Sequence, residues 1–175
     1  MATGYTSIIL LGITLIIGPL NVIKRNHNPV STDLRRDIGI WCGVIGLVHV
    51  VVGIQVHMGN IWLYFVKAVE GNDKYALRSD LFGTANYTGL LAATILLLLL
   101  VLSNDLSLRI LKPGRWKNLQ RWSYAGFILI LAHSVIYQVI EKRASWIIFL
   151  FAVITIIPIT LQSIGLRKSF MNRKS

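Results

Sequence analysis

The sequence is poor in charge, and poorest in acidic residues. Asp and Glu together number 7 in 175 residues, against 18 for Lys and Arg, and charged residues amount to only 14%. Soluble globular domains carry about 25% charged residues. Hydrophobic residues make up 54% of this chain. The composition therefore excludes an ordinary water-soluble domain and indicates a membrane protein.

Cysteine clusters and glycine-rich loops are also missing. The single cysteine, Cys42, excludes a disulfide within the chain, and no Cys/His cluster has the spacing of a zinc site. No glycine-rich phosphate loop marks a nicotinamide or flavin domain, so a flavin has no recognisable binding motif here. A metal could be bound only through histidine.

The excess of basic residues is distributed in short runs between apolar segments. A nucleic-acid-binding protein would instead carry its positive charge on a polar surface. The pattern excludes nucleic acid as a partner and favours a lipid bilayer with an anionic face.

Five stretches contain no charged residue: 1–23, 38–66, 81–104, 122–140 and 144–166. A helix needs about 20 apolar residues to cross roughly 30 Å of hydrocarbon, so each stretch predicts one transmembrane helix. We expect an all-α membrane protein, a single transmembrane domain over residues 1–175. Its five-helix bundle is predicted from helices at about 5–23, 38–57, 81–102, 122–140 and 145–165. The remainder of the second stretch, 58–66, is aromatic and is expected to lie at the membrane interface.

The basic residues predict the orientation of the bundle. Thirteen of the 18 fall in the segments 24–37, 105–121 and 167–174. Because cytoplasmic loops carry the excess of Lys and Arg, the N-terminus is expected outside and the C-terminus in the cytoplasm. We expect an integral, multi-pass protein of a bacterial inner or thylakoid-like membrane. The first two basic segments are interpreted as polar connections, the second broken at Lys112-Pro113-Gly114.

Two histidines are predicted to lie at the same depth in the membrane. His49 follows Arg36 by 13 residues and His133 follows Arg121 by 12, which is about 20 and 18 Å along the helix axes. The second and fourth predicted helices run in the same direction, so both imidazoles could face one interior point. Ionisable residues inside a membrane indicate a functional site, and this geometry suits a haem with two histidine ligands. The alternative is that each histidine only forms a hydrogen bond between helices.

Glycines flank His49 on its helix. Gly46 lies about 60° and Gly53 about 40° around the helix from His49, which would let a flat cofactor approach. The alternative is close packing of a neighbouring helix against the same glycines. His57, at the far end of this helix, is expected to be an interfacial residue. The alternative is an auxiliary role at the outer face of the protein, beside the haem edge, an electron acceptor or a substrate. Polar residues elsewhere, such as Asn86, Thr155 and Gln162, are expected to form hydrogen bonds between helices.

Two runs of sequence resemble a known family. They are RRDIGIWC at 35–42, followed by His49, and KPGRWKNLQRWSY at 112–124, followed by His133. Together with LIIGPL at 15–20 they resemble the ferric reductase-like transmembrane domain family. The most similar pattern is that of the haem-binding membrane subunit of the periplasmic methionine sulfoxide reductase system.

The resemblance implies a b-type haem held by His49 and His133, and electron transfer across the membrane. The donor would be a cytosolic flavin-dependent reductase or a quinol, and the acceptor an external molecule, a partner subunit or a larger membrane complex. Gln120 replaces a histidine that is typical of the family, so one haem is expected rather than two. If the chain itself acts on a substrate, the resemblance implies an oxidoreductase of ferric reductase-like type. The sequence shows no evident catalytic residue. The alternative is a structural or accessory subunit without a working haem.

The basic, tryptophan-containing segment before the fourth predicted helix has two interpretations. Positive-inside topology and an interfacial aromatic belt explain it without further function. Alternatively, Arg115, Lys117 or Arg121 binds haem propionates, a flavin phosphate or an acidic donor protein. The N-terminal dipole of the fourth predicted helix would add to that attraction.

Overall fold

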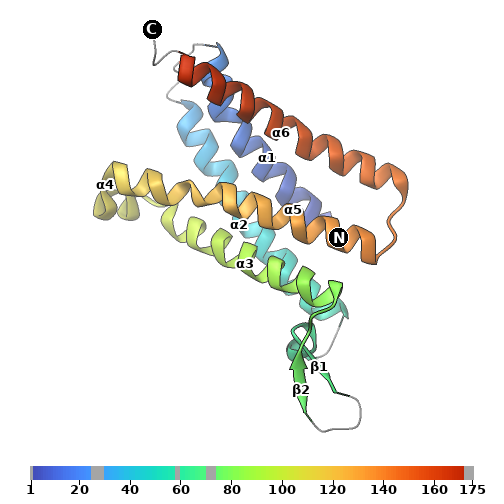
Figure 1. The fold of residues 1–175 in the computed structure, drawn as a ribbon. Coiled ribbons are helices and arrows are strands. Elements are labelled where there is room, and N and C mark those ends of the chain that lie inside the picture. The colour runs from blue at the N-terminus through green and yellow to red at the C-terminus, as the bar shows by residue number, and fades with distance from the viewer. Residues whose placement is uncertain (1, 25–29, 58–59, 70–73, 172–175) are drawn as a thin grey trace. The chain divides into compact units, whose positions relative to one another are not determined.

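The computed structural model describes residues 2–24, 30–57, 60–69 and 74–171, without the side chains of Thr32, Val56 and His57, and is predominantly helical (Figure 1). The α-helices are α1 (Ala2–Lys24), α2 (Val30–His57), α3 (Leu81–Leu102), α4 (Asp105–Gln120), α5 (Trp122–Ile140) and α6 (Ser145–Met171). A short 3-10 helix, η1 (Ile61–Tyr64), precedes an antiparallel hairpin of β1 (Val66–Ala68) and β2 (Tyr75–Leu77). Five helical segments in the described residues are long and apolar enough to cross a membrane, the fourth comprising α4 and α5. The predicted all-α membrane architecture is confirmed, and the chain is an integral multi-pass membrane protein.

Two predicted helix boundaries were wrong. α2 begins at Val30 rather than near 38, so Ser31 and Asp33 lie inside the helix instead of in a polar connection. Asp33 stands in the first turn, where a carboxylate interacts favourably with the helix dipole. α6 continues to Met171 instead of ending near 165, because its basic end is made of good helix-forming residues.

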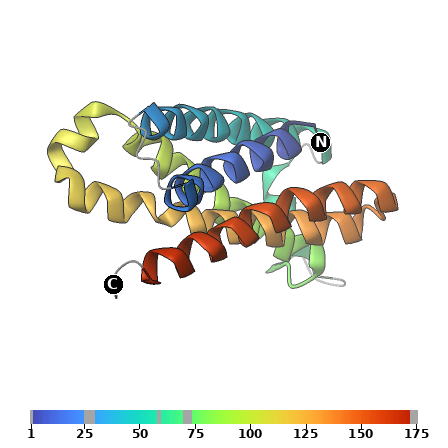
Figure 2. The same ribbon diagram turned by 90° about the horizontal axis from the view of Figure 1, so that it is seen from above.

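The second basic segment is helical rather than an irregular connection. α4 occupies nearly all of it, and only the predicted break at Lys112 is present. There φ is 62° and ψ is 152°, so α4 bends sharply before Pro113, as its yellow ribbon shows in Figure 2. The extended ψ is the one that a following proline requires.

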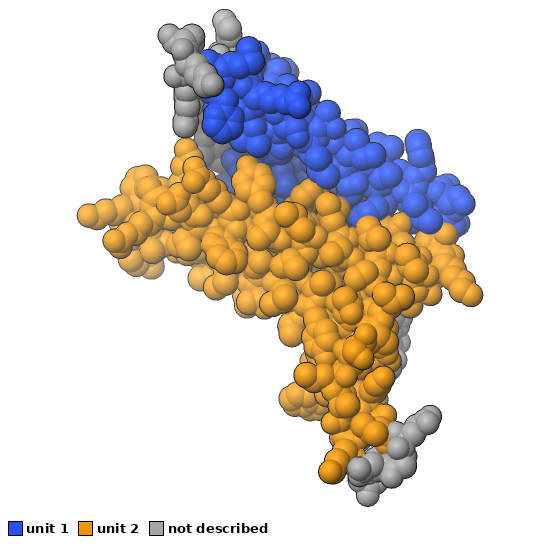
Figure 3. Space-filling model, in the orientation of Figure 1, with its two compact units in different colours: residues 1–45, 144–175 blue, residues 46–143 orange. Residues whose placement is uncertain are grey.

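The chain divides into two compact units, coloured separately in Figure 3. The first comprises residues 1–45 and 144–175, and the second comprises residues 46–143. α2 contributes its first part to one unit and its second part to the other. The single-domain organisation and the orientation of the termini remain predictions.

In the first unit, α1 and α6 pack side by side (Figure 1). Two proline–glycine contacts join them. A Cβ added to Gly165 would lie 2.8 Å from Cβ of Pro19, and one added to Gly12 would lie 3.2 Å from Cγ of Pro158. Each proline therefore packs where the opposite helix has no side chain. Close approach of this kind is how helices associate in lipid, where no hydrophobic driving force is available.

Pro19 also leaves a backbone carbonyl without its usual donor. It has no N–H, so the carbonyl of Leu15, four residues earlier, cannot form its helical hydrogen bond. The side-chain amide of Gln162 donates to that carbonyl at 2.5 Å. α1 therefore continues through Pro19 to Lys24. Interhelical hydrogen bonding was the role predicted for Gln162, whereas Thr155 bonds to Ala152 of its own helix.

In the second unit, α3 packs along α5 (Figure 1). The buried apolar side chains of α3 are Ala85, Ala92, Ile95, Leu96 and Leu99. Phe127 of α5 is also buried, and a Cβ added to Gly126 would lie 3.2 Å from Ile95. The small residues let the two helix backbones approach closely.

Residues 60–69 and 74–80 form a folded connection between α2 and α3, which we term the hairpin segment. Arg78 forms an ion pair with Asp80 at 2.9 Å and donates a hydrogen bond to the carbonyl of Leu63. Asp80 in turn caps α3 by accepting from the backbone N–H of Gly83 at 2.7 Å. The hydrogen bonds from Arg78 and Gly83 lower the pKa of the Asp80 carboxyl below its ordinary value of 3.8. The carboxylate of Asp80 is therefore charged at neutral pH, and its cap on α3 weakens only when the pH falls through the lowered pKa.

α5 ends in a Schellman motif that places a lysine in a left-handed conformation. The N–H of Arg143 bonds to the carbonyl of Gln138, and that of Lys142 bonds to the carbonyl of Val139. Lys142 occupies the intervening position with φ of 46°. Glycine is the usual residue there, because a Cβ is unfavourable at positive φ.

We predict that Lys142→Gly raises the free energy of unfolding by roughly 0.5–1 kcal/mol, since it removes the left-handed strain and costs some chain entropy. Chemical unfolding in detergent micelles measures the change. Glu141→Gly is the matched control, because Glu141 has φ of −84° and gains nothing from glycine. Equal stability of the two variants would contradict the assignment of strain to Lys142.

Candidate functional site

His49 of α2 and His133 of α5 lie next to each other inside the second unit. Their ring centroids are 6.4 Å apart and the ring planes are inclined at 82°. Both side chains are half-buried. The two residues are 84 positions apart in the sequence, and the structure brings them together as the depth argument predicted.

The His133 ring is held by α3. Its Nδ1 lies 2.8 Å from the backbone carbonyl oxygen of Ala85. A carbonyl can only accept, so Nδ1 carries the proton and Nε2 keeps its lone pair. Metal-binding histidines in proteins commonly donate their second ring N–H to a carbonyl in this way, which fixes the tautomer and the ring orientation.

Gly89 provides the space in which the His133 ring lies. A Cβ added at Gly89 would be 2.6 Å from Nδ1 and 2.7 Å from Cε1 of His133. The imidazole therefore rests directly on the backbone of α3. The role of Gly89 was not predicted, because nothing in its local sequence indicates which ring packs against it.

A chain of polar contacts surrounds the two histidines. The Tyr137 ring lies 4.9 Å from that of His133, and its hydroxyl donates to Oδ1 of Asn86 at 2.7 Å. Nδ2 of Asn86 donates to the carbonyl of Tyr64 at 3.2 Å. The Tyr64 hydroxyl donates to the carbonyl of Gly53 on α2 at 2.9 Å. Of these residues, sequence analysis assigned an interhelical role only to Asn86.

The glycines and the third histidine predicted for the site are placed as follows. Gly53 has open space beside it, since a Cβ there would meet no atom within 4 Å. Gly46 is buried. His57 is the last residue of α2, and its side chain lies outside the described part of the chain. Its auxiliary role therefore remains a prediction.

The basic residues predicted for anion or partner binding are exposed. Arg115 and Lys117 lie on α4, and Arg121 at its junction with α5 donates to Oδ1 of Asn118 at 3.2 Å. Arg121 has helical φ and ψ of −66° and −18°, so α5 continues from α4 with a single turn between them. Arg121 is the N-cap of α5, and its carbonyl accepts from the N–H of Tyr124. Attraction of an anion by the dipole of this helix remains a prediction.

Gln120, the residue at the family's histidine position, is at the C-terminal end of α4. Its Nε2 is buried and has no hydrogen-bond partner in the described residues. The same holds for Oγ of Ser123, one turn further along. Neither atom identifies a second cofactor position.

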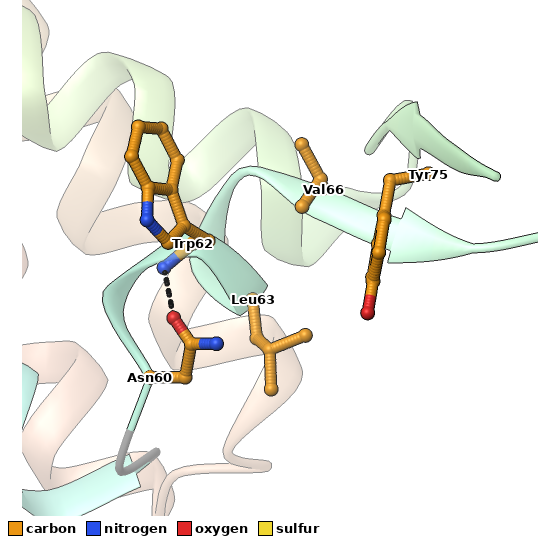
Figure 4. A pocket seen from close by; sticks show the side chains of 5 residues that line it. All are labelled: Asn60, Trp62, Leu63, Val66 and Tyr75. Atoms are coloured by element: carbon orange, nitrogen blue, oxygen red, sulfur yellow. Dashed lines mark hydrogen bonds between the residues drawn. The ribbon is translucent and has the colours of Figure 1, made fainter. Parts of the chain in front are cut away.

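A shallow cavity of about 350 Å³ lies in the hairpin segment (Figure 4). It is lined by Asn60, Trp62, Leu63, Val66 and Tyr75. The side chain of Asn60 accepts from the backbone N–H of Trp62, which fixes the start of η1. No histidine lines this cavity, so it is separate from the histidine pair.

Within the described residues, no group of three or more His, Cys, Asp or Glu side chains could hold a metal ion. The histidine pair therefore supplies two ligands at most.

We predict that Gly89→Ala lowers the free energy of unfolding by about 1–3 kcal/mol, because the new methyl group collides with the His133 ring. Gly53→Ala is the matched control, since a methyl group fits there and a helical alanine gains up to about 1 kcal/mol over glycine. Both variants are compared by chemical unfolding in the same detergent. If Gly89→Ala is as stable as Gly53→Ala, the ring does not rest on Gly89.

Comparison with known proteins supports the assignment made from the sequence. The family model described as ferric reductase like transmembrane component matches residues 3–131, well over half of the chain. The match includes His49 and ends two residues before His133. The comparisons with curated proteins and with solved structures gave no significant match. The chain belongs to the ferric reductase-like transmembrane family, and this membership indicates a role in membrane electron transfer.

Proposed function

We propose that the protein is a b-type haem electron carrier in which His49 and His133 hold the haem iron. The observation that carries the proposal is the separation of the two rings. Two imidazoles bound to opposite sides of one metal ion, at about 2 Å each, have ring centroids about 6 Å apart. The separation of 6.4 Å fits this arrangement.

The donor set also fits. His133 gives its Nδ1 proton to Ala85, which leaves Nε2 as a ligand with a fixed orientation. The open space beside Gly53 is consistent with a flat group approaching α2 one turn from His49. The histidine pair offers two ligands, which matches a metal whose other ligands come from a porphyrin.

Haem b supplies reversible one-electron chemistry at its iron. A haem held by both His49 and His133 would have no iron position left for oxygen or another substrate. The two imidazoles would therefore favour simple electron transfer over binding and activation of a substrate. The half-buried position of both rings restricts water around them.

The direction of transfer follows from the predicted topology. The exposed basic side chains of α4 lie on the side predicted to be cytoplasmic, where an acidic surface of a flavin-dependent reductase would be attracted. A quinol is the alternative donor. The hairpin segment would then face the opposite side, where an external acceptor or partner subunit takes the electron. Gln120 in place of the family's histidine supports one haem rather than two.

We predict that the purified protein shows a low-spin b-type redox difference spectrum with about one haem per chain. His49→Ala and His133→Ala should each abolish it or convert it to a high-spin form, because each removes one axial ligand. Absorption spectra with haem-to-protein stoichiometry provide the measurement. His27→Ala is the control, since this histidine lies in a segment predicted to be a polar connection.

Absence of haem from the wild type, or an unchanged spectrum in both histidine variants, would contradict the proposal. The accessory-subunit function would then be preferred. If His27→Ala also loses haem, the loss in the other variants reflects general disruption of the protein and not removal of an iron ligand.

A further inference from the structure

A chain of three hydrogen bonds, which we term the circuit, links the two histidine-bearing helices through Tyr64, Asn86 and Tyr137. On α2, Gly53 lies one turn after His49 and its carbonyl accepts from the Tyr64 hydroxyl. On α5, Tyr137 lies one turn after His133 and its hydroxyl donates to Asn86. Asn86 completes the circuit by donating to the carbonyl of Tyr64.

The circuit lies in a dry environment. Tyr64 is 6% exposed and Asn86 is 8% exposed, so water does not compete for these hydrogen bonds. The Asn86 amide uses both its oxygen and its nitrogen, one toward α5 and one toward the hairpin segment. Buried hydrogen-bond networks rigidify a structure and define one arrangement when their members are paired.

The circuit also includes the support of the His133 ring. Ala85, whose carbonyl accepts from Nδ1, is the residue immediately before Asn86 on α3. The Tyr137 ring packs on the same imidazole at 4.9 Å. A shift of α3 relative to α5 would therefore move the hydrogen bond that orients His133.

We propose that Tyr64, Asn86 and Tyr137 are positioning residues that set the spacing and the mutual angle of the His49 and His133 rings. The inference rests on the proposed haem site and adds which residues hold the rings of His49 and His133 at a fixed distance and angle. None of the three needs to touch the iron. Their hydrogen bonds fix α2, α3 and α5 at the level of the histidines.

Three tyrosines allow a matched test. Tyr64→Phe and Tyr137→Phe each remove one hydroxyl from the circuit and keep the ring. Tyr87→Phe is the control: its hydroxyl donates to the carbonyl of Phe65 at 2.7 Å, which is also a link between α3 and the hairpin segment but lies outside the circuit. Each variant therefore loses one hydroxyl donor in the same region, although the Tyr64 hydroxyl also lies 3.2 Å from the carbonyl oxygen of Ile54.

The readout is the low-temperature EPR spectrum of the oxidised haem protein, because its largest g value depends on the angle between the axial imidazole planes. The wild-type angle of 82° predicts a strongly anisotropic low-spin signal. We expect Tyr64→Phe and Tyr137→Phe to retain haem but to shift and broaden this signal, while Tyr87→Phe matches the wild type. Unchanged signals in both circuit variants, or an equal shift in the control, would overturn the proposal.

A second measurement does not depend on haem. Nitrogen-15 NMR of the haem-free protein, labelled at histidine, reports which ring nitrogen of His133 carries the proton. We expect protonated Nδ1 in the wild type and in Tyr87→Phe, and a mixture of tautomers in Tyr137→Phe. If the wild type binds no haem, the proposed function fails, and this spectrum decides the positioning role. A single unchanged tautomer in all variants would then reject it.

Discussion

The absence of water from the membrane interior is the constraint on which the rest of the structure depends. Every polar group at that depth needs a partner from the protein itself, because lipid offers none. The carbonyl of Leu15, deprived of its donor by Pro19, is paired with Gln162. The imidazole of His133 is paired with the carbonyl of Ala85, and the amide of Asn86 uses both of its ends. In each case the hydrogen bond also fixes which helix lies beside which.

The candidate site follows from the same constraint. A half-buried imidazole has two ring nitrogens to satisfy, and the fold provides a carbonyl for one nitrogen of His133. The other nitrogen is available to a ligand, with His49 close by on α2. Gly89 makes this possible, because the backbone of α3 can approach the ring only where no side chain intervenes. The support for His133 therefore comes from a helix that carries neither histidine.

The sequence predicted the charge-determined features and missed those that depend on packing. Charge-free stretches located the five spans, and equal distances from basic boundaries paired His49 with His133. The helical state of α4 was missed, because turn-forming residues at Lys112-Pro113-Gly114 suggested an irregular segment while they only bend the helix. The roles of Gly89 and Tyr137 could not be predicted, since each depends on which helix lies opposite. One sequence contains no direct signal for such a contact.

The hydrogen bond from Gln162 to the carbonyl that Pro19 leaves without a donor constrains the order in which these two residues could arise. A proline introduced alone would leave the Leu15 carbonyl without a partner in hydrocarbon, which is a costly intermediate. A glutamine at position 162 introduced first would meet a carbonyl already bonded within its own helix, which is a mild change by comparison. The accessible route therefore begins with glutamine and ends with proline. Once both are present, Gln162 can no longer be lost without reversing Pro19 first.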